Sequence, residues 1–167
     1  MRPAEPRDAA AVRAVHMAAF PTSLEADLVE AVERAGDAVI SLLAEQDGKV
    51  VGHILLSRMT VTGDGRAYRA LGLAPVAVLP DAQGRGVGSA LIRAALSRAG
   101  AEGEELVFVL GEPVYYRRFG FDPEMAAPFA SPYAGPYFMA LRLDPRVPLP
   151  ATGRADYAPA FAELEEE

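Results

Sequence analysis

The sequence predicts a mixed α/β fold in which helices flank a sheet with both antiparallel and parallel strands. Three β-rich runs follow one another between residues 38 and 79, separated by turn sequences, which predicts an antiparallel meander. A helical pattern and a buried apolar strand come next, and this strand–helix–strand order adds a crossover to the meander. The 167 residues hold no repeat or low-complexity linker, so we expect one domain, residues 1–167, ending in a proline-rich extension at 144–167.

Two amphipathic helices are expected before the first strand. Asp8 is a suitable N-cap for the first helix. Thr22 and Glu25 match a capping box at the start of the second, and Gly36 ends it. The apolar positions at helical spacing are Val12, Val15 and Ala19 in the first helix and Leu24, Leu28, Ala31, Val32 and Ala35 in the second.

The meander follows from the turn residues between its runs. Residues 38–44 and 50–57 are short apolar runs joined across Asp47 and Gly48, a dipeptide typical of tight hairpins. A second glycine-rich turn leads into the third run, residues 68–79. The three runs therefore predict consecutive antiparallel strands.

The second half of the chain alternates between helix and strand. Residues 86–99 have helical apolar spacing, 106–110 read as a buried strand, 114–118 as a short helical turn and 137–143 as a last strand. The segment 122–136 is rich in proline and alanine, and we expect a loop there. The extension at 144–167 should wrap the surface, with an additional edge strand at 153–161 as an alternative.

Composition and charge exclude several classes of function. Without cysteine, the chain forms no disulfide, no thiolate nucleophile and no cysteine-based zinc site. The net charge of −7, to which glutamates at 163 and 165–167 contribute, argues against nonspecific binding to nucleic acid. No apolar run approaches the roughly 20 residues that span a bilayer, and the first residues lack a signal peptide's apolar core. We expect a cytoplasmic protein with no membrane partner and no nucleic-acid partner.

The most informative segment is a glycine-rich turn between an apolar strand and a helix, within residues 75–96. Gly84, Gly86 and Gly88 lie where the helix is expected to begin. Glycines there allow backbone to approach a ligand closely, and the first N–H groups of a helix have no partner within it. Those donors and the positive end of the helix dipole suit a phosphate or pyrophosphate, to which Arg85 is placed to add a charged contact.

Two common phosphate motifs do not fit this turn. The spacing differs from G-x-x-x-x-G-K-[ST] and no lysine follows the glycines, which argues against a nucleoside triphosphatase. It also differs from G-x-G-x-x-G, and no acidic residue about 20 positions on lies at the end of a second strand, as a dinucleotide-binding fold requires. On the glycines alone, a tight turn without a ligand remains an alternative.

A second motif supports the phosphate interpretation through a family resemblance. The pattern Q-x-x-G-x-G at 83–88, after the strand sequence VAVLP, resembles the acyl-CoA pyrophosphate loop of the GNAT acetyltransferases. Residues 116–121, YRRFGF, are similar to that family's second signature, Y-x-[KR]-x-G-F, and 109–121 are most similar to its YhbS-like bacterial branch. The resemblance covers residues 7–143 in element order. It implies the GNAT-like acyl-CoA N-acyltransferase fold, a mostly antiparallel central sheet with splayed strands.

The resemblance also implies the co-substrate and the residues that bind it. The co-substrate would be acetyl-CoA, without a metal, and its pantetheine arm would pair with the strand before the turn, where one N–H polarises the thioester carbonyl. Pro75 fits a splayed strand because proline cannot donate to a ladder, although an ordinary strand start is an equal alternative. The implied contacts are Val76, Ala77, Val78, Gln83, Gly84, Arg85, Gly86, Val87, Gly88 and Ser89.

Tyr116 fills the tyrosine position of the second signature, so the resemblance implies that it is the general acid for the CoA thiolate. The alternative is a packing aromatic whose hydroxyl bonds to backbone. Tyr115 is the rival acid, and as the adjacent residue it should point elsewhere. Many family members carry an asparagine shortly before this tyrosine that contacts the pantetheine. Residues 109–112 contain none, so no such contact is assigned.

No general base is evident in the sequence. Glu25 and Asp27 lie near the helix that borders the acceptor site in many relatives, and Glu112 is close to Tyr116. Deprotonation through water is an equally good alternative. The two histidines, at positions 16 and 53, are far apart in the sequence, so we expect structural roles for both and no metal site.

The resemblance implies an N-acetyltransferase that moves the acetyl group of acetyl-CoA to a primary amine of a small molecule or peptide. The alternative is a non-catalytic module that binds or senses acyl-CoA, and a homodimer is an open possibility. The acceptor would be shaped by the loops at 20–27, 57–66 and 122–136, because loops are the segments that vary most. The aromatic residues that would wall its pocket, or cover the core instead, are Phe129, Tyr133 and Tyr137.

Overall fold

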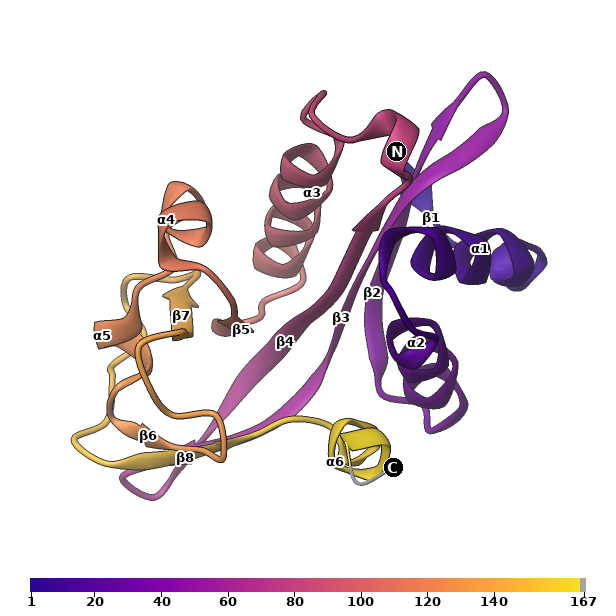
Figure 1. Ribbon diagram of the computed structural model, residues 1–167. Helices are drawn as coiled ribbons and strands as arrows, with labels where there is room; N and C mark the ends of the chain where they lie inside the picture. The colour runs from indigo at the N-terminus through magenta and orange to yellow at the C-terminus, as the bar shows by residue number, and fades with distance from the viewer. Residues whose placement is uncertain (166–167) are drawn as a thin grey trace.

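The computed structural model describes residues 1–165 and shows one mixed sheet with helices on both faces (Figure 1). The α/β prediction is confirmed. Glu166 and Glu167 of the acidic tail lie outside the described residues. The strands are β1 (Arg2–Pro3), β2 (Ala38–Gln46), β3 (Lys49–Gly63), β4 (Arg66–Val78), β5 (Leu106–Leu110), β6 (Phe129–Ala130), β7 (Phe138–Arg142) and β8 (Gly153–Asp156). The helices are α1 (Ala9–Ala19), α2 (Leu24–Arg34), α3 (Val87–Ala101), α4 (Pro113–Tyr116), α5 (Pro123–Ala126) and α6 (Pro159–Glu165), with 3-10 turns at Pro6–Asp8, Pro80–Ala82 and Arg117–Phe119.

The predicted meander is present as β2, β3 and β4. Asp47 and Gly48 both have positive φ, 52° and 77°, as a two-residue hairpin turn requires. Asp64 and Gly65 repeat this geometry at the second turn, with φ of 49° and 77°. The sheet order is β1-β2-β3-β4-β5-β7, and β8 pairs with both β3 and β6.

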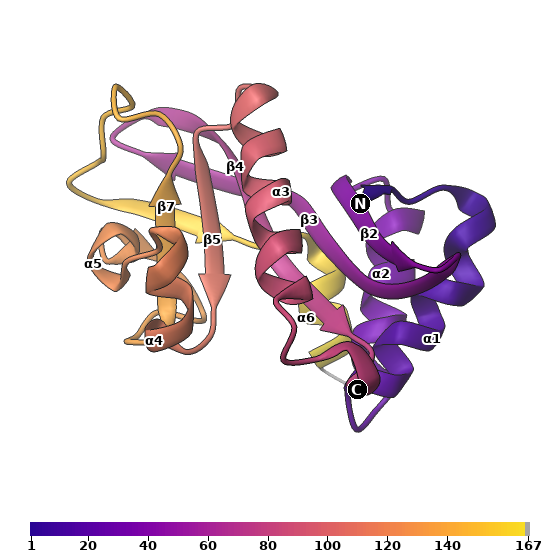
Figure 2. The same ribbon diagram turned by 90° about the horizontal axis from the view of Figure 1, so that it is seen from above.

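The crossover through α3 places β5 parallel to β4, but the two strands pair over a short stretch only. Residues 70–72 of β4 pair with 106–108 of β5, and β4 then continues to Val78 without a partner on that side. We call the end of this pairing, Gly72 opposite Phe108, the fork. On its other edge β5 pairs with β7 along its whole length (Figure 2).

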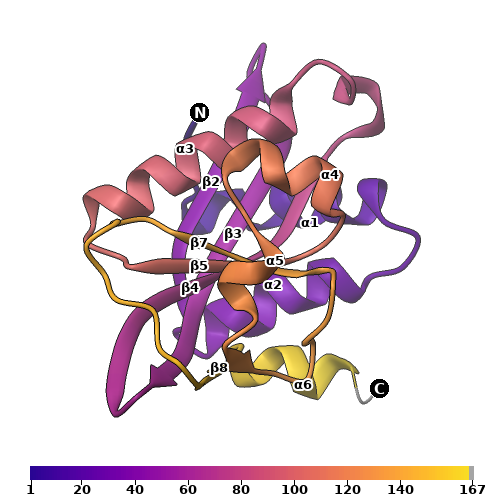
Figure 3. The ribbon, with the colours of Figure 1, turned by 90° about the vertical axis from the view of Figure 1, so that its left-hand side faces the viewer.

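Helices cover the two faces of the sheet unequally. In Figure 3, α3 and α4 lie in front of the sheet, and α1 and α2 lie behind it. Side chains alternate between faces along a strand, so β3 contributes Ile54 and Leu56 to the core on one face and Leu55 to the core on the other. The core on the α3 side includes Ile54, Leu56, Leu71, Leu73, Leu91 and Ile92, and the core under α1 and α2 includes Val12, Val29, Val32, Leu43 and Leu55.

The two N-terminal helices form where expected, and Asp8 is the N-cap residue of α1 as predicted, but the predicted N-cap of α2 is wrong. Asp8 occupies the N-cap of α1 without a side-chain cap bond, because Arg2 of β1 binds its carboxylate at 2.8 Å. Ser23, one residue after Thr22, is the N-cap of α2. The buried positions of α2 also differ from the prediction, since Leu24 is 43% exposed. The buried residues of α2 are Ala26, Val29 and Val32.

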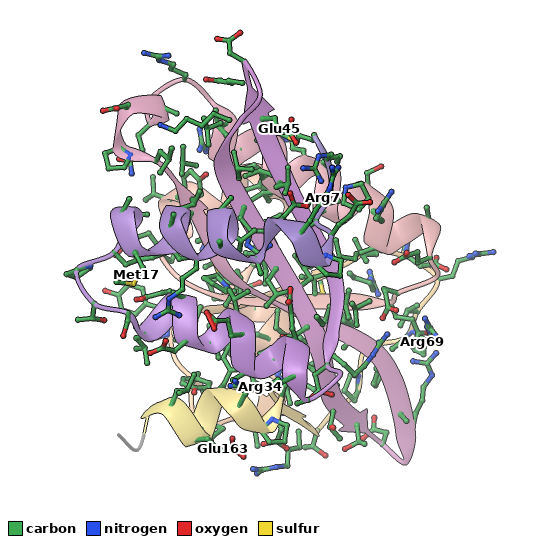
Figure 4. The ribbon with its side chains drawn as sticks, turned by 90° about the vertical axis from the view of Figure 1, so that its right-hand side faces the viewer. Arg7, Met17, Arg34, Glu45, Arg69 and Glu163 are labelled. Atoms are coloured by element: carbon green, nitrogen blue, oxygen red, sulfur yellow. The ribbon has the colours of Figure 1, made fainter. Side chains whose placement is uncertain are left out.

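The C-terminal third contains more regular structure than the sequence predicts. The expected loop at 122–136 holds α5 and β6, and Asp122 caps α5 by accepting from the Glu124 N–H at 2.9 Å. The alternative strand at 153–161 is present as β8, antiparallel to residues 60–63 of β3. It is followed by α6, which packs beside α2, and Figure 4 shows α1, α2 and α6 side by side on this face.

Candidate active site

The glycine turn joins β4 to α3 and has left-handed backbone at two positions. Gly84 and Gly86 have φ of +78° and +81°, a region that favours glycine, and open space lies where their Cβ atoms would be. Gly86 is the N-cap of α3, which has no side-chain cap. The first intrahelical bond runs from the Ala90 N–H to the Gly86 carbonyl at 2.9 Å, so the N–H groups at 87–89 face away from the helix body.

These N–H groups border a cavity of about 340 Å³ at the positive end of the α3 dipole. Seven of the ten residues that resemblance assigns to acetyl-CoA line it. Arg85 does not line it, and neither do Val76 and Ala77 of β4. The lining residues are Val78, Ala82, Gln83, Gly84, Gly86, Val87, Gly88, Ser89, Tyr115 and Arg118.

Three lining residues, Ala82, Tyr115 and Arg118, are not among the contacts that the resemblance implies. Arg118 stacks its guanidinium 4.5 Å from the ring centre of Tyr115 and reaches to 3.4 Å from Ser89 Oγ. The structure thus places the positive charge of Arg118 at the rim of the cavity. Its i, i+3 spacing from Tyr115 on a helical turn was the available signal. Gln83 has a structural contact as well, because its Nε2 donates to the Val78 carbonyl at 2.9 Å and closes the turn.

The stretch of β4 before the turn has one unpaired edge. Residues 73–78 pair with β3 on one side, and no β5 pairing is present on the other within the described chain. Pro75 lies in this stretch, follows a cis peptide bond, and falls at a shift in the β3–β4 register. Val76 and Val78 face the α3 side of the sheet. Ala77, between them, is paired with His53 in the β3–β4 register. The main-chain groups of 73–78 are therefore accessible to an extended ligand.

Tyr116 lies on the other side of the fork, at the end of α4. Its ring contacts Phe121 edge-to-face at a centroid separation of 5.9 Å, and it fills the space beside Gly111, where an added Cβ would lie 2.5 Å from the ring. Burial, with a smaller contribution from Tyr115, raises the pKa of Tyr116 to about 12. Tyr116 therefore keeps its phenolic proton across the physiological pH range and is a proton donor there.

Tyr115 points in a different direction from Tyr116, as expected. Their rings are 5.0 Å apart and nearly perpendicular, at 87°. The Tyr115 hydroxyl lies 3.6 Å from the position of a Cβ on Gly88, at the start of α3. The two tyrosines thus have different surroundings, because Tyr115 lies at the glycine turn and Tyr116 packs against Gly111 and Phe121.

The two histidines, far apart in the sequence, are in direct contact in the structure. His16 Nε2 lies 2.9 Å from His53 Nδ1, and His53 Nε2 lies 2.8 Å from Ser41 Oγ. Both rings are fully buried. Burial lowers the pKa of His16 to about 4, and burial followed by the neighbouring His16 lowers the pKa of His53 to about 3. The pair is therefore neutral at pH 7, and among residues 1–165 no group of three or more metal-ligating side chains exists.

The three acidic candidates for a general base have different surroundings. Asp27 is occupied, because it accepts from Ser23 Oγ and from Arg13, and these hydrogen bonds lower its pKa. Glu112 is exposed at the start of α4. Glu25 has one carboxylate oxygen, Oε2, that is buried without a partner in the described part of the chain.

The aromatic residues expected at the acceptor site separate into two groups. Phe129 is 1% exposed and belongs to the core. Tyr133 packs edge-to-face on Tyr157 at 5.4 Å, and Tyr137 is 53% exposed. A further aromatic residue, Tyr157, was not singled out from the sequence. It lies at the fork, against Gly72.

The glycine turn, the unpaired edge of β4 and the buried phenol together define an acyl-CoA-type site, and comparison with known families agrees. A family model described as an acetyltransferase (GNAT) domain matches residues 1–123. The chain belongs to the GNAT acetyltransferase family. No helix among residues 1–165 is long and apolar enough to cross a membrane.

Two curated relatives come from Escherichia coli and are described as uncharacterized N-acetyltransferases. YjhQ of strain K12 is 44% identical over 118 residues, which cover 70% of this chain and 65% of YjhQ, slightly less than two thirds of its length. YhbS is 32% identical over 118 residues, which cover 70% of each protein.

Two similar solved structures contain the ligand type that the site suggests. A GNAT family acetyltransferase from Brucella melitensis, in complex with acetyl-CoA, is 36% identical with a TM-score of 0.78 and covers 96% of both chains. YhbS from Escherichia coli, in complex with CoA, is 28% identical with a TM-score of 0.84, covering 96% of this chain and 90% of that one.

Proposed function

We propose that this protein is an N-acetyltransferase that transfers the acetyl group of acetyl-CoA to a primary amine of a small molecule or peptide. The observation that carries the proposal is the cavity of about 340 Å³ at the uncapped N-terminus of α3, next to the unpaired edge of β4. The cavity at the helix N-terminus suits phosphates, and the unpaired edge of β4 suits an extended chain that contains amides. The relatives solved with acetyl-CoA or CoA support the same co-substrate.

The residues present fit CoA along its length. N–H groups at 87–89 and the dipole of α3 would hold the pyrophosphate, and Arg118 would add a positive charge at the rim. The glycines at 84, 86 and 88 leave room for the phosphates. Val76 and Val78 would offer main-chain groups to the pantetheine amides. Arg85 is exposed outside the cavity, so its role is limited to charge attraction.

The reaction requires little covalent participation from the protein. Acetyl-CoA supplies an acyl carbon that forms a bond to the amine nitrogen while the bond to sulfur breaks. Tyr116 would then give its proton to the departing thiolate, since its raised pKa keeps that proton in place. An N–H of β4 would hold the carbonyl oxygen, and the amine would lose its extra proton to water or to an acidic residue such as Glu25.

Release of free thiol from acetyl-CoA tests the proposal across a panel of primary amines and peptides. Acetyltransfer predicts thiol release that depends on at least one amine and an acetylated product of matching mass. The alternative, a non-catalytic acyl-CoA sensor, predicts calorimetric binding of CoA without thiol release for any acceptor. A titration that shows no CoA binding would contradict both.

A further inference from the structure

One tyrosine from the C-terminal segment lies against the fork between β4 and β5. An ideal Cβ on Gly72 would come within 2.5 Å of Tyr157 Cε1 and 2.8 Å of its Cδ1, so this ring occupies the space above Gly72. Gly72 is the last residue of β4 that pairs with β5. The ring therefore covers the point where the two strands separate.

The ring is held in this position by its own segment. β8 pairs with residues 60–63 of β3, which brings the chain back across the sheet to the face opposite α3. Phe161 of α6 lies 4.9 Å from the Tyr157 ring centre, and Tyr133 meets it edge-to-face at 5.4 Å. Aromatic contacts on two sides make this a fixed wall rather than a free side chain.

The hydroxyl of Tyr157 belongs to the same electrostatic environment as the proposed acid. Burial raises the pKa of Tyr157, and the hydroxyl groups of Tyr133 and Tyr116 raise it further.

The strand directions determine which end of an acyl-CoA would meet Tyr157. The glycine turn follows the carboxyl end of β4, and the fork lies six residues earlier, about 20 Å back along the strand at 3.3 Å per residue. A ligand with its pyrophosphate at the turn and its pantetheine along 73–78 extends its acyl end toward the fork. An acyl chain longer than acetyl would be directed at the Tyr157 ring.

We propose that the Tyr157 ring closes the inner end of the acyl site and limits the acyl group to about the size of acetyl. The inference rests on the proposed use of acyl-CoA. Tyr157 lies beyond residue 123, outside the segment that the family model matches, so this wall comes from the C-terminal extension. A hydrophobic pocket that cannot enlarge discriminates by roughly 10- to 200-fold per methylene.

Calorimetric binding of acyl-CoA thioesters, without an acceptor, tests the proposal directly. The ligands are free CoA, acetyl-CoA, butyryl-CoA and hexanoyl-CoA. The variants are Tyr157→Phe, which keeps the ring, Tyr157→Leu and Tyr157→Ala, which shorten it, and Tyr137→Ala, an exposed tyrosine, as matched control. The wild type, Tyr157→Phe and Tyr137→Ala should bind butyryl-CoA at least about tenfold more weakly than acetyl-CoA.

In Tyr157→Ala the ratio of the butyryl-CoA and acetyl-CoA dissociation constants should fall toward one, while the affinity for free CoA stays unchanged. The ratio for Tyr157→Leu should lie between those of Tyr157→Ala and the wild type. If the alanine variant does not fold, the comparison of leucine with phenylalanine tests the same wall. Equal binding of acetyl-CoA and hexanoyl-CoA by the wild type, or equal ratios in all variants, would overturn the proposal that Tyr157 limits the acyl group. Either result would leave the proposed function intact. Absence of free CoA binding in the wild type would overturn both.

Discussion

At the scale of single residues, the adjacent tyrosines of α4 show how one turn can serve two purposes. Tyr115 faces the glycine turn, where Arg118 stacks on it at 4.5 Å, and Tyr116 packs between Phe121 and Gly111. The two hydroxyls therefore differ in surroundings, and burial raises the pKa of Tyr116 to about 12. A general acid must carry its proton before the transfer, and the raised pKa ensures this for Tyr116, while the same raised pKa lowers the driving force for giving the proton up.

Replacing Tyr116 by Phe should lower kcat by about 10²- to 10⁴-fold, the usual contribution of a positioned general acid. Affinity for acetyl-CoA should stay the same, because the ring is retained. Steady-state thiol release and calorimetry measure the two effects separately, with Tyr115→Phe as the control that keeps kcat. Because the Tyr116 pKa is about 12, the wild-type rate should show no loss of an acid between about pH 7 and 10. Full activity of Tyr116→Phe would remove it from the mechanism.

The buried histidine pair predicts a pH-dependent stability. Burial lowers the pKa from an ordinary value of 6.5 to about 4 for His16 and about 3 for His53. Between pH 6.5 and these lowered values, the unfolded chain therefore binds more protons than the folded chain. Stability from the neutral pair is complete above about pH 6.5 and is lost as the pH falls toward 4 and 3. Thermal melts from about pH 7 to about pH 4.5 should show a falling Tm in the wild type.

The matched variant carries both His16→Gln and His53→Gln, which keep polar groups in place but do not titrate. Its Tm should start lower at neutral pH and fall less steeply over the same range. A slope equal to that of the wild type would mean that the histidine pair does not control acid stability.

At the residue scale, sequence alone could predict the types of side chain at the site but not their partners. Gln83 was expected at the phosphate, yet it closes the turn on the Val78 carbonyl. The histidine contact joins positions 37 apart in the sequence and depends on how α1 packs on β3, which no local pattern encodes. Tyr157 meets Gly72 for the same reason.

At the scale of elements, the strand–turn–helix unit from β4 to α3 is the part that local sequence specifies best. Left-handed glycines at 84 and 86 and an uncapped helix start are direct consequences of glycine's missing Cβ. The caps of α1 and α2 were predicted less well, because a distant residue, Arg2, takes the carboxylate of Asp8. Local sequence predicts a capping hydrogen bond correctly only when no distant residue binds the capping side chain.

Gly88→Ala separates binding from folding in this unit. A Cβ at Gly88 would make ordinary contacts of 3.6 Å, and alanine favours a helix over glycine by about 1 kcal/mol, so Tm should be equal or higher. The methyl group would nevertheless stand beside the N–H groups proposed for the pyrophosphate. Affinity for CoA should therefore fall by about tenfold or more, equal to ~1.4 kcal/mol.

Gly100→Ala in the same helix is the control for this change. Gly100 has open space around it and no positive φ, so the substitution should raise Tm comparably without changing CoA affinity. Equal CoA binding by Gly88→Ala and the wild type would place the pyrophosphate elsewhere.

At the scale of the whole molecule, the extension at 144–167 completes the face of the sheet opposite α3. β8 lengthens the sheet beside β3, and α6 packs against α2 (Figure 4). We propose that residues 1–167 fold as a single domain. The order of β2 to β5 with α3 could be predicted because hairpin turns and a short crossover are local. The place of β8 could not, since its partner is about 90 residues away.

A single domain predicts one cooperative unfolding transition. Thermal unfolding followed by far-UV circular dichroism and by tyrosine fluorescence should give the same midpoint. Tyr157 lies in the extension and packs on Tyr133 outside it, so two separated midpoints would show that the extension unfolds independently of the sheet.

The most direct test of the proposed site is a crystal structure of the protein with acetyl-CoA. We predict that the pyrophosphate oxygens accept hydrogen bonds from N–H groups of residues 84–89. We also predict that the pantetheine pairs with residues 73–78 of β4 and that the acetyl group lies between Tyr116 and Tyr157. A CoA molecule bound away from the glycine turn, or with its thioester outside the fork, would contradict the proposed site and the chemistry derived from it.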